Sequence, residues 1–522
     1  MRRVIVSVST LTVMVVLGQA AFRSVFADTP KGTDSQFKTG TTNAKQAEDA
    51  SKNLEWTLPN SAWMVPFAEE IPILYVPYSK TKEWTALPSF WNPGTERARD
   101  PKTGEEVDRK VVRIKLPLGL NQPPTVPAEN PMIVGRWALG KQLFFDRALS
   151  SDASVSCASC HDPKRGFTDQ SRFATGIGGQ LGGMSAPTIL NSAYHQLQFW
   201  DGRAHSLEDQ AQGPVANAVE MFDGKGNAWD SVVTRVRQKK DYTPRFHKFF
   251  GVDPTRDAIA KAIATYERTV FSGNSITDRA ELAMRIRAAD EESTKQDVLP
   301  KDYEGVLKEA IAKKDEHSLS ALKLTGSEDA AKIRNLATSL SRGRALFFGK
   351  ARCNSCHVGD NFTDNQFHNI GVGVKNGVIT PSLLGRYAQL PLGHKDPQLV
   401  GAFKTPTVRG LVGTSPFLHD GSEDTLEKVV DFYDRGGEPS EYLDVKMRNL
   451  DAEVSFELAR AKKTQYTGPE VKVINGKAIA PLKLNLTSQE KQDLVAFMRS
   501  LQGDAVDPIV SDRDRTPETA AK

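Results

Sequence analysis

The spacing of hydrophobic positions along the chain predicts a mainly helical protein. Ile259, Ile263, Tyr266 and Val270 lie on one helical face within residues 253–271. An Asp-Pro pair opens this segment and is a helix-start signal. We therefore expect helices joined by irregular loops.

A second helix is expected near the C-terminus. Thr487 and Glu490 have the spacing of a capping box. Apolar residues then continue as far as Leu501, and Gly503 ends the helix. The sequence beyond about residue 505 is polar, so we expect a disordered tail over residues 506–522.

The segments around these helices have weaker patterns. Residues 54–125 are rich in Pro and Trp and predict an irregular N-terminal wrap, with short strands at Ile71–Val76 and Lys110–Leu116. Residues 275–335 are highly charged and helix-prone, which favours a helical insertion over a separate domain.

The N-terminus has the layout of a secretory signal peptide. Arg2 and Arg3 precede an apolar run, Val4 to Leu17, and a small-residue site follows, so we expect cleavage after Ala27. A membrane anchor is the alternative, although a spanning helix usually needs about 20 apolar residues. Residues 28 to about 50 are polar and predict a flexible leader.

Composition narrows the function classes only slightly. The 522 residues are 39% hydrophobic and 25% charged, which is typical of a soluble globular protein. The formal net charge of +4 is small for this length and predicts neither nucleic-acid binding nor an acidic partner.

All four cysteines lie in two Cys-x-x-Cys-His motifs, formed by Cys157, Cys160 and His161 and by Cys353, Cys356 and His357. This pattern is typical of c-type haem attachment, in which two thiols add to the haem vinyl groups and the histidine binds the iron. A zinc site or a redox dithiol is the alternative. Two copies of the motif in an exported chain favour two covalent haems c.

The two motifs belong to a diverged internal repeat. Leu139–Phe145 precedes the first motif and Arg342–Phe348 the second, and each reads as a short helix whose paired aromatics pack near a haem. The predicted fold is therefore mainly α, with two tandem cytochrome c-like haem domains. The expected divisions are a signal peptide (1–27), a leader and irregular extension (28–125), a first haem domain (126–274), a charged helical insertion (275–340), a second haem domain (341–505) and the tail.

Further motifs resemble one family, the bacterial di-haem cytochrome c peroxidases and their relative MauG. The resemblance runs from about Asn130 to Gly503, without the insertion, and several motifs in one order make it specific. The motifs are Leu143–Asp146, Phe199–Arg203, Gln210, Glu220-Met221, Phe403–Arg409 and His419–Gly421.

The resemblance implies different roles for the two haems. The haem on His161 would react with peroxide beneath Gln210 and Glu220, and the haem on His357 would store and relay electrons. Taken without the resemblance, Glu220 would be read as a surface carboxylate. The resemblance places Trp200 between the haems as an electron carrier, although it could equally be a buried core aromatic.

Two departures from the peroxidase pattern affect the expected mechanism. The Gly-rich loop Thr175–Gly183 lacks the histidine that often caps the peroxidatic iron, and His195 falls beyond it, so we expect a first haem that is five-coordinate or water-bound. Fourteen residues after His419, where the peroxidases usually supply methionine, stands Tyr433, as in MauG. Met447 and Met498 are the alternative iron ligands.

Two further features follow from the resemblance. His419 and Arg409 are expected near the second haem, at its propionates. A structural calcium ion is expected between the modules, with the backbone carbonyls of Thr414 and Pro416 as ligands, although Ser185 stands where the family uses an asparagine.

The leading hypothesis is a periplasmic peroxidase that reduces hydrogen peroxide with electrons from a small cytochrome c or cupredoxin. MauG-like oxidation of a protein or organic substrate is the second hypothesis, and Tyr433 and the missing loop histidine favour it. A pure electron-transfer cytochrome is the third. A homodimer is left open.

Overall fold

A computed structural model of the chain describes residues 70–100, 103–291 and 297–516. The signal peptide expected over 1–27 and the leader after it lie outside the described residues, as does the end of the chain beyond 516. Within the described part, no helix has both the length and the hydropathy needed to cross a membrane.

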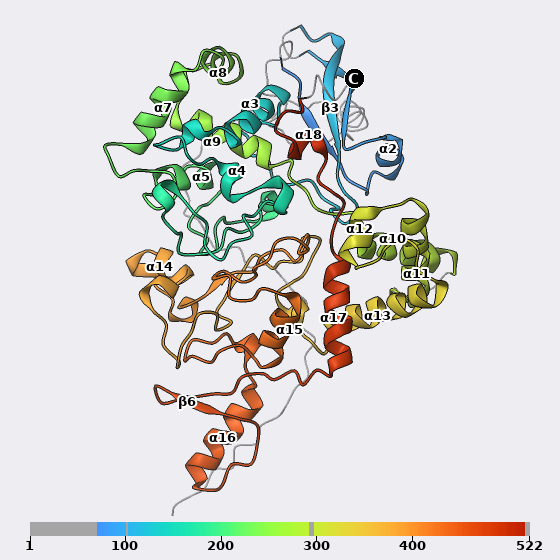
Figure 1. Ribbon diagram of the computed structural model, residues 1–522, viewed down its shortest axis with the longest axis vertical. Helices are drawn as coiled ribbons and strands as arrows, with labels where there is room; N and C mark the ends of the chain where they lie inside the picture. Colours follow the sequence, from blue (N-terminus) through green and yellow to red (C-terminus); the bar gives the residue numbers. More distant parts are fainter. Residues whose placement is uncertain (1–69, 101–102, 292–296, 517–522) are drawn as a thin grey trace, which may run out of the picture. The chain divides into compact units, whose positions relative to one another are not determined.

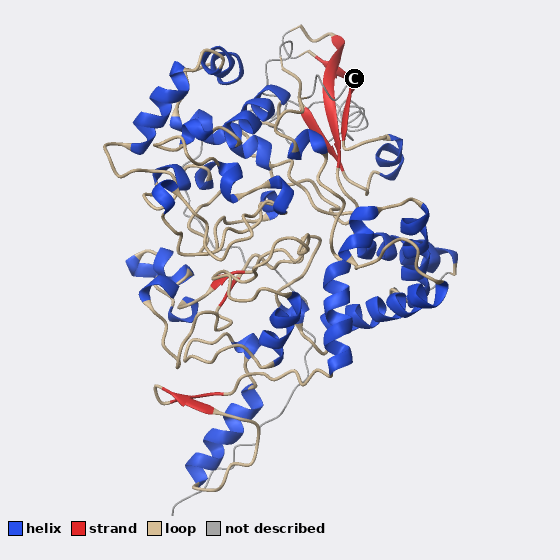
Figure 2. Cartoon of the chain, in the orientation of Figure 1, coloured by secondary structure: helices blue, strands red, loops and turns tan. Residues whose placement is uncertain are grey.

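The structure is mainly helical, which confirms the predicted fold class at this level (Figures 1 and 2). The helices are α2 (Thr81–Ala86), α3 (Val134–Phe144), α4 (Cys157–Cys160), α5 (Leu207–Gln210), α6 (Gly213–Ala216), α7 (Ala228–Gln238), α8 (Tyr242–Phe250), α9 (Arg256–Glu267), α10 (Ile276–Asp290), α11 (Pro300–Ala312), α12 (Glu316–Ala321), α13 (Ala330–Phe348), α14 (Arg386–Gln389), α15 (Leu426–Asp434), α16 (Leu450–Lys462), α17 (Ser488–Ser500) and α18 (Pro508–Ser511). The strands are β1 (Ile73–Val76), β2 (Trp91–Arg99), β3 (Glu106–Lys115), β4 (Phe367–His368), β5 (Phe403–Lys404), β6 (Lys472–Ile474) and β7 (Lys477–Ile479).

The expected irregular wrap is more regular than predicted, because its described part contains a three-stranded sheet. β3 is the central strand, with β1 parallel on one side and β2 antiparallel on the other. The two strands expected from the sequence are present with shifted bounds, but β2 was missed because Pro93 and Gly94 weaken its strand pattern. Pro93 is tolerated there because β2 lies at the sheet edge.

The internal repeat corresponds to two helix pairs that pack in the same way. α3 packs against α9 and α13 packs against α17. A Cβ atom on Gly140 would lie 1.7 Å from the carbonyl oxygen of Ala262, and one on Gly343 would lie 2.0 Å from that of Asp493. The glycine of each repeat therefore permits a close helix crossing that any larger residue would prevent.

Both helices expected from the hydrophobic pattern are present. α9 starts at Arg256 with Thr255 as its N-cap, a little later than expected, and ends at Glu267, a little earlier. Ile259, Ile263 and Tyr266 are buried within it, and Val270 is buried just beyond its end. α17 has the predicted capping box between Thr487 and Glu490.

The charged segment after residue 275 forms helices α10 to α12 and most of α13, as its composition predicts. These helices have an apolar cluster of their own, which includes Met284, Tyr303, Leu307 and Leu340. The expected boundary between residues 340 and 341 falls inside α13, so this helix joins the charged segment to the second haem motif.

The C-terminal tail is ordered as far as the structure describes it, which corrects the prediction of disorder for residues 506–516. Ile509 and Val510 of α18 are fully buried in the apolar core that contains Trp137, Phe144 and Tyr266. The ammonium of Lys141 donates to the carbonyl oxygens of Ile509 and Arg515. Two adjacent apolar residues thus anchor a segment whose average composition is polar.

Candidate cofactor site

The two Cys-x-x-Cys-His motifs open into one cavity of about 530 Å³. Its lining includes Cys160 and His161 of the first motif and Cys353, Cys356 and His357 of the second. Cys157 does not line the cavity and instead packs against the apolar core that contains Trp137 and Phe144. The four thiols are not paired as disulfides. Burial raises the pKa of Cys160 to about 11 and that of Cys353 to about 12.

Both motif histidines are oriented as haem ligands require. Nδ1 of His161 lies 3.3 Å from the carbonyl oxygen of Phe167, and Nδ1 of His357 lies 3.0 Å from that of Phe362. A carbonyl oxygen can only accept, so Nδ1 carries the proton and Nε2 keeps its lone pair for a metal. Burial lowers the pKa of both imidazoles, which favours the neutral form. These residues fit two covalently attached haems.

Glu220 and Gln210 line the same cavity as His161. Gln210 ends α5, which is capped by Ser206. Glu220 accepts a hydrogen bond of 2.7 Å from the side-chain amide of Asn217. Burial raises the pKa of Glu220, and Arg203 and Asn217 only partly offset this effect. The expectation from sequence placed the two residues in one pocket, and their catalytic roles stay predictions.

The Gly-rich loop reaches the cavity through Gly176, Gly182 and Gly183. His195, which lies beyond the loop in sequence, also lines the cavity. Its Nδ1 is 3.1 Å from the side-chain oxygen of Asn365. Burial and the nearby Lys404 lower its pKa to about 3, so its ring is neutral. The coordination state of the first haem stays a prediction.

Trp200 also lines the cavity and connects the two halves of its wall. Its indole N–H donates to the carbonyl of Ser185 over 2.8 Å, and its own carbonyl accepts from the backbone N–H of Lys404 on β5. Its ring lies edge-on to His419 with centroids 6.3 Å apart. The side chain is half-buried, so it is both a packed aromatic and a cavity wall.

Tyr433 of α15 lines the cavity, and so do Met447 and Met498. The structure therefore brings all three candidate ligands of the second haem to the same space. Burial, followed by the neighbouring Cys356 and Cys353, raises the pKa of the Tyr433 phenol. The choice of Tyr433 over the two methionines stays a prediction.

Of the two residues expected at the propionates, only His419 lines the cavity. Its ring stacks on Phe403 at 3.6 Å, and its buried Nε2 has no hydrogen-bond partner among the described residues. Arg409 instead forms a buried ion pair with Asp278 of α10 and donates to backbone carbonyls. Its guanidinium is fully engaged, so the expected propionate contact has no support.

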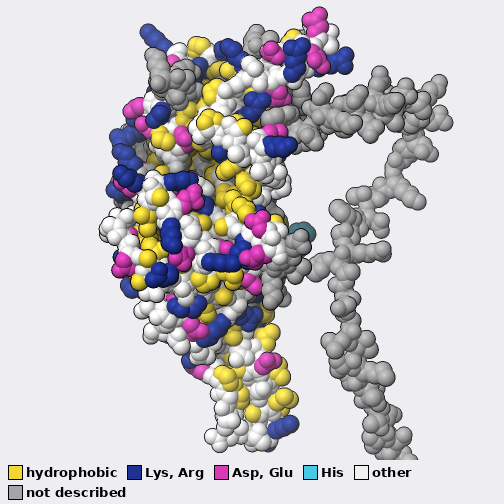
Figure 3. All heavy atoms as spheres, turned by 90° about the vertical axis from the view of Figure 1, so that its right-hand side faces the viewer, with side chains coloured by type: hydrophobic (Ala, Val, Ile, Leu, Met, Phe, Trp, Pro, Cys, Tyr) yellow, Lys and Arg dark blue, Asp and Glu magenta, His cyan; other side chains and the backbone are white. Residues whose placement is uncertain are grey.

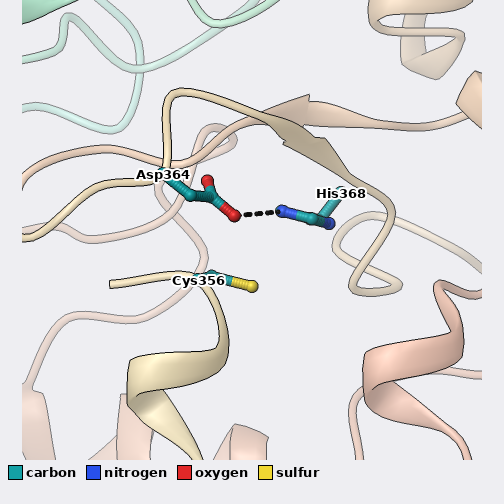
Figure 4. A group of neighbouring side chains, drawn as sticks. All are labelled: Cys356, Asp364 and His368. Atoms are coloured by element: carbon teal, nitrogen blue, oxygen red, sulfur yellow. Dashed lines mark hydrogen bonds and ion pairs between the residues drawn. The ribbon is translucent and has the colours of Figure 1, made fainter. Parts of the chain in front are cut away.

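The calcium expectation is not tested by the structure. Thr414 and Pro416 lie on the cavity wall, and the Ser415–Pro416 peptide bond is cis. Among the described residues, the group with metal-ligand spacing is Cys356, Asp364 and His368 (Figure 4). It is better read as an ion-pair cluster, because Cys356 belongs to a haem motif and both nitrogens of His368 are bonded to carboxylates, those of Asp364 and Asp444.

Two buried ionisable residues of the cavity were missed in the sequence analysis. Lys404 is 8% exposed, and its ammonium has no hydrogen-bond or ion-pair partner among the residues that the structure describes. Burial lowers its pKa to about 7. Glu267 has one carboxyl oxygen without a partner, and burial raises its pKa to about 8. Sequence gave no signal for either, since both lie inside segments read for other features.

Comparisons with known proteins agree with this site. The sequence profile of the di-haem cytochrome c peroxidases matches residues 135–284. Cytochrome-c peroxidase IdrP1 of Pseudomonas sp. (strain SCT) is 30% identical over 424 residues, covering 77% of this chain and 89% of the relative. Methylamine utilization protein MauG of Methylorubrum extorquens is 31% identical over 383 residues, covering 72% and 81%.

A solved structure is also similar, that of a MauG-like protein associated with microbial copper homeostasis. The TM-score is 0.53 at 25% identity, and the match covers 75% of this chain and 97% of that one. The fold and the two attachment motifs thus define a c-type haem protein. The chain belongs to the di-haem cytochrome c peroxidase family and is an oxidoreductase of the cytochrome-c peroxidase type, with haem c as cofactor.

Proposed function

We propose that the protein reduces hydrogen peroxide to water with electrons from a small redox protein. The electrons pass from the haem on His357 to the haem on His161. The observation that carries this proposal is the single cavity that joins both haem motifs, with Gln210 and Glu220 in its wall. In this arrangement the motifs belong to two tandem haem domains, with the peroxidatic one first.

Glu220 is the proposed proton shuttle. Cleavage of the O–O bond is easier when a proton moves from one peroxide oxygen to the other, so that water can leave. Burial raises the pKa of Glu220 towards the range in which it can both take and return a proton. Asn217 holds one of its carboxyl oxygens, and Gln210 supplies an amide that can orient the peroxide.

Trp200 is the proposed route for electrons between the two motifs. It is held at its indole nitrogen by Ser185 and at its carbonyl by Lys404, so its ring has a fixed position on the cavity wall. When bound, the haems supply irons that exchange electrons, and the iron on His161 supplies a coordination position for a peroxide oxygen. Thr414 and Pro416 are the proposed calcium ligands in the same wall.

We place this reaction in the periplasm. The charged start, the apolar run and the small-residue site before Ala27 support export.

The test is steady-state peroxide consumption by the holoprotein with a reduced small cytochrome c or cupredoxin as donor. We expect peroxide-dependent oxidation of the donor, at a rate that depends on both concentrations. Two six-coordinate haems and no reaction with peroxide would instead identify a pure electron-transfer cytochrome.

A second candidate is MauG-like, peroxide-dependent oxidation of a protein or organic substrate. Two observations favour it: Tyr433 lies in the cavity with the second motif, and no histidine stands in the loop over the first. A phenolate ligand lowers the reduction potential of haem iron relative to methionine, so oxidised states become easier to reach. Oxidising equivalents that persist after peroxide addition without a donor would favour this candidate over the first.

A further inference from the structure

Helix α16 carries an unusual row of exposed apolar side chains. Leu450, Val454 and Leu458 recur every four residues and are 47%, 59% and 53% exposed. This spacing puts them on one face of the helix. The opposite face is packed, because Ala452 and Glu453 are buried and Phe456 contacts Tyr466. A rigid apolar face in water is typical of an interaction site.

The structure holds this face firmly in place. α16 packs against β7, and β7 pairs with β6 (Figure 1). Arg448 forms a bidentate pair with Glu453, and the same carboxylate accepts the backbone N–H of Ala480. The exposed row is therefore the outer side of an anchored element, and Figure 3 shows hydrophobic side chains gathered at this lower end of the molecule.

The surroundings of the row are basic. Residues 445–485 contain eight Lys and Arg and four Asp and Glu. Six of the eight basic side chains pair with carboxylates. Lys462 and Lys463, at the end of α16, have no ion-pair partner among the described residues. The end of α16 therefore carries unpaired positive charge that the modest net charge of the chain does not reveal, and this charge favours an acidic partner.

This basic, apolar surface is continuous with the second haem motif. Lys446 donates to the carbonyl of Ser355, between Cys353 and Cys356, over 2.6 Å. Met447, the next residue, lines the cavity. Leu450 follows three residues later, which places the start of the row within about 11 Å of Met447 along the chain.

We propose that the outer face of α16 is the docking surface for an acidic electron-donor protein that delivers electrons to the haem on His357. This inference rests on the proposed peroxidase function. A transient redox complex needs only a small contact, and an apolar centre with a charged rim suits fast association and release. A second copy of this chain is disfavoured, because a two-fold interface would bring the same basic segments together.

The experiment measures peroxide turnover by the full-length holoprotein with three donors: a reduced acidic cupredoxin, a reduced basic cytochrome c and a small chemical reductant. The variants are Val454→Glu, Leu458→Glu and Lys462→Glu. Ile286→Glu is the matched control, because Ile286 is an apolar residue of α10 with a similar exposure of 55%.

We expect the KM for the acidic cupredoxin to rise about tenfold or more in Val454→Glu and Leu458→Glu, with kcat retained. Lys462→Glu should raise this KM less, and should weaken the dependence of the KM on salt concentration. Turnover with the chemical reductant should stay within about twofold in every variant, because these are surface changes. Ile286→Glu should leave all three donors unaffected.

An unchanged KM for the cupredoxin, or a preference for the basic cytochrome c, overturns the proposal. So does a dimer, or binding to anionic lipid vesicles, that Leu458→Glu abolishes. If wild type fails to turn over peroxide even with the chemical reductant, the proposed function fails instead. Docking is then judged by titrating the oxidised cupredoxin directly: binding that Val454→Glu weakens supports it, and no binding overturns it.

Discussion

The backbone N–H of Lys404 donates to the carbonyl of Trp200 over 2.7 Å. This bond joins β5, which follows the second haem motif in sequence, to the segment that follows the first. Because the indole N–H of Trp200 is bound to Ser185, the residue is fixed at two points. An aromatic ring held in this way changes position little, so its contribution to electron transfer can be tested by substitution.

We expect Trp200→Phe to slow donor-dependent peroxide reduction by at least about tenfold, which corresponds to about 1.4 kcal/mol in the barrier. Phenylalanine keeps an aromatic wall but is harder to oxidise and cannot donate to Ser185. Stopped-flow oxidation of the reduced holoprotein by peroxide measures the step. The control is Trp84→Phe, which removes an equivalent indole bond to the carbonyl of Leu116 away from the cavity. Equal rates in wild type and Trp200→Phe would show that Trp200 does not carry electrons between the two haems.

We expect Glu220→Gln to lower the rate constant for the reaction with peroxide by about 10²- to 10⁴-fold, the usual effect of losing a proton shuttle. In wild type, this rate should fall as the pH drops through the pKa of Glu220, because the protonated carboxyl cannot accept a proton. Burial raises that pKa, so the fall should begin above the usual range for glutamate. This fall in rate at low pH should be absent from the pH profile of Glu220→Gln. Glu208→Gln is unsuitable as a control, since Glu208 forms a buried pair with Arg268.

Lys404 should lie beside a negative group in the holoprotein. A buried ammonium without a counter-charge is costly, and the haem propionates are the anions that this family brings into the cavity. We expect Lys404→Met to lower the reduction potential of one haem by on the order of 50 mV, close to the tenfold equivalent for one electron. Spectroelectrochemical titration identifies which haem responds. Lys428→Met, which removes an exposed lysine paired with Asp424, is the control and should shift neither potential.

The sequence predicted those features that depend on short local patterns. The haem motifs, α9 and the capping box of α17 each need only residues near in sequence, and all are present in the structure. The repeat was recognised, but its aromatic pairs were expected near the haems. Of these aromatics only Phe347 lines the cavity, whereas Phe144 packs against Tyr266. The close helix crossing that the glycine of each repeat allows was not foreseen from the sequence.

Features that depend on contacts between distant segments could not be predicted. The ion pair of Arg409 with Asp278 joins residues far apart in sequence, so nothing near Arg409 showed that its guanidinium was engaged. Lys404 looks like any exposed lysine until β5 is placed against Trp200. The tail was misread because its average polarity hides Ile509 and Val510, whose burial is a tertiary effect.

Tyr433 can be tested against its two alternatives in one series. If it binds the second iron, Tyr433→Phe should change the spectrum of that haem, and Tyr433→Met should raise its reduction potential, because a thioether stabilises the reduced iron relative to a phenolate. Met447→Leu and Met498→Leu are the matched controls and should leave the ferric spectrum unchanged. A spectral change in either methionine variant, with none in Tyr433→Phe, would move the ligand assignment to that methionine.

His368 is expected to stabilise the fold near the second motif as an imidazolium between two carboxylates. Burial alone would lower its pKa, but Asp364 and Asp444, at 2.9 and 2.7 Å, together with the neighbouring Cys356, raise it to about 11. A folded-state pKa above the unfolded value means that the stabilisation is complete below about pH 6.5 and is lost as the pH rises towards about 11. Breaking a largely buried pair costs on the order of 3 kcal/mol, so His368→Gln should lower the free energy of unfolding by about that amount at pH 7.

Urea unfolding of the holoprotein at about pH 6 and pH 10 measures this dependence. The difference between wild type and His368→Gln should shrink as the pH rises, because the wild-type imidazole loses its charge while glutamine has none to lose. The control is His247→Gln. His247 makes an ion pair of similar length with Asp253, but both side chains are more than half exposed, so solvent screening should keep its effect below about 1 kcal/mol. A His368→Gln effect that is independent of pH would show that His368 contributes packing rather than charge.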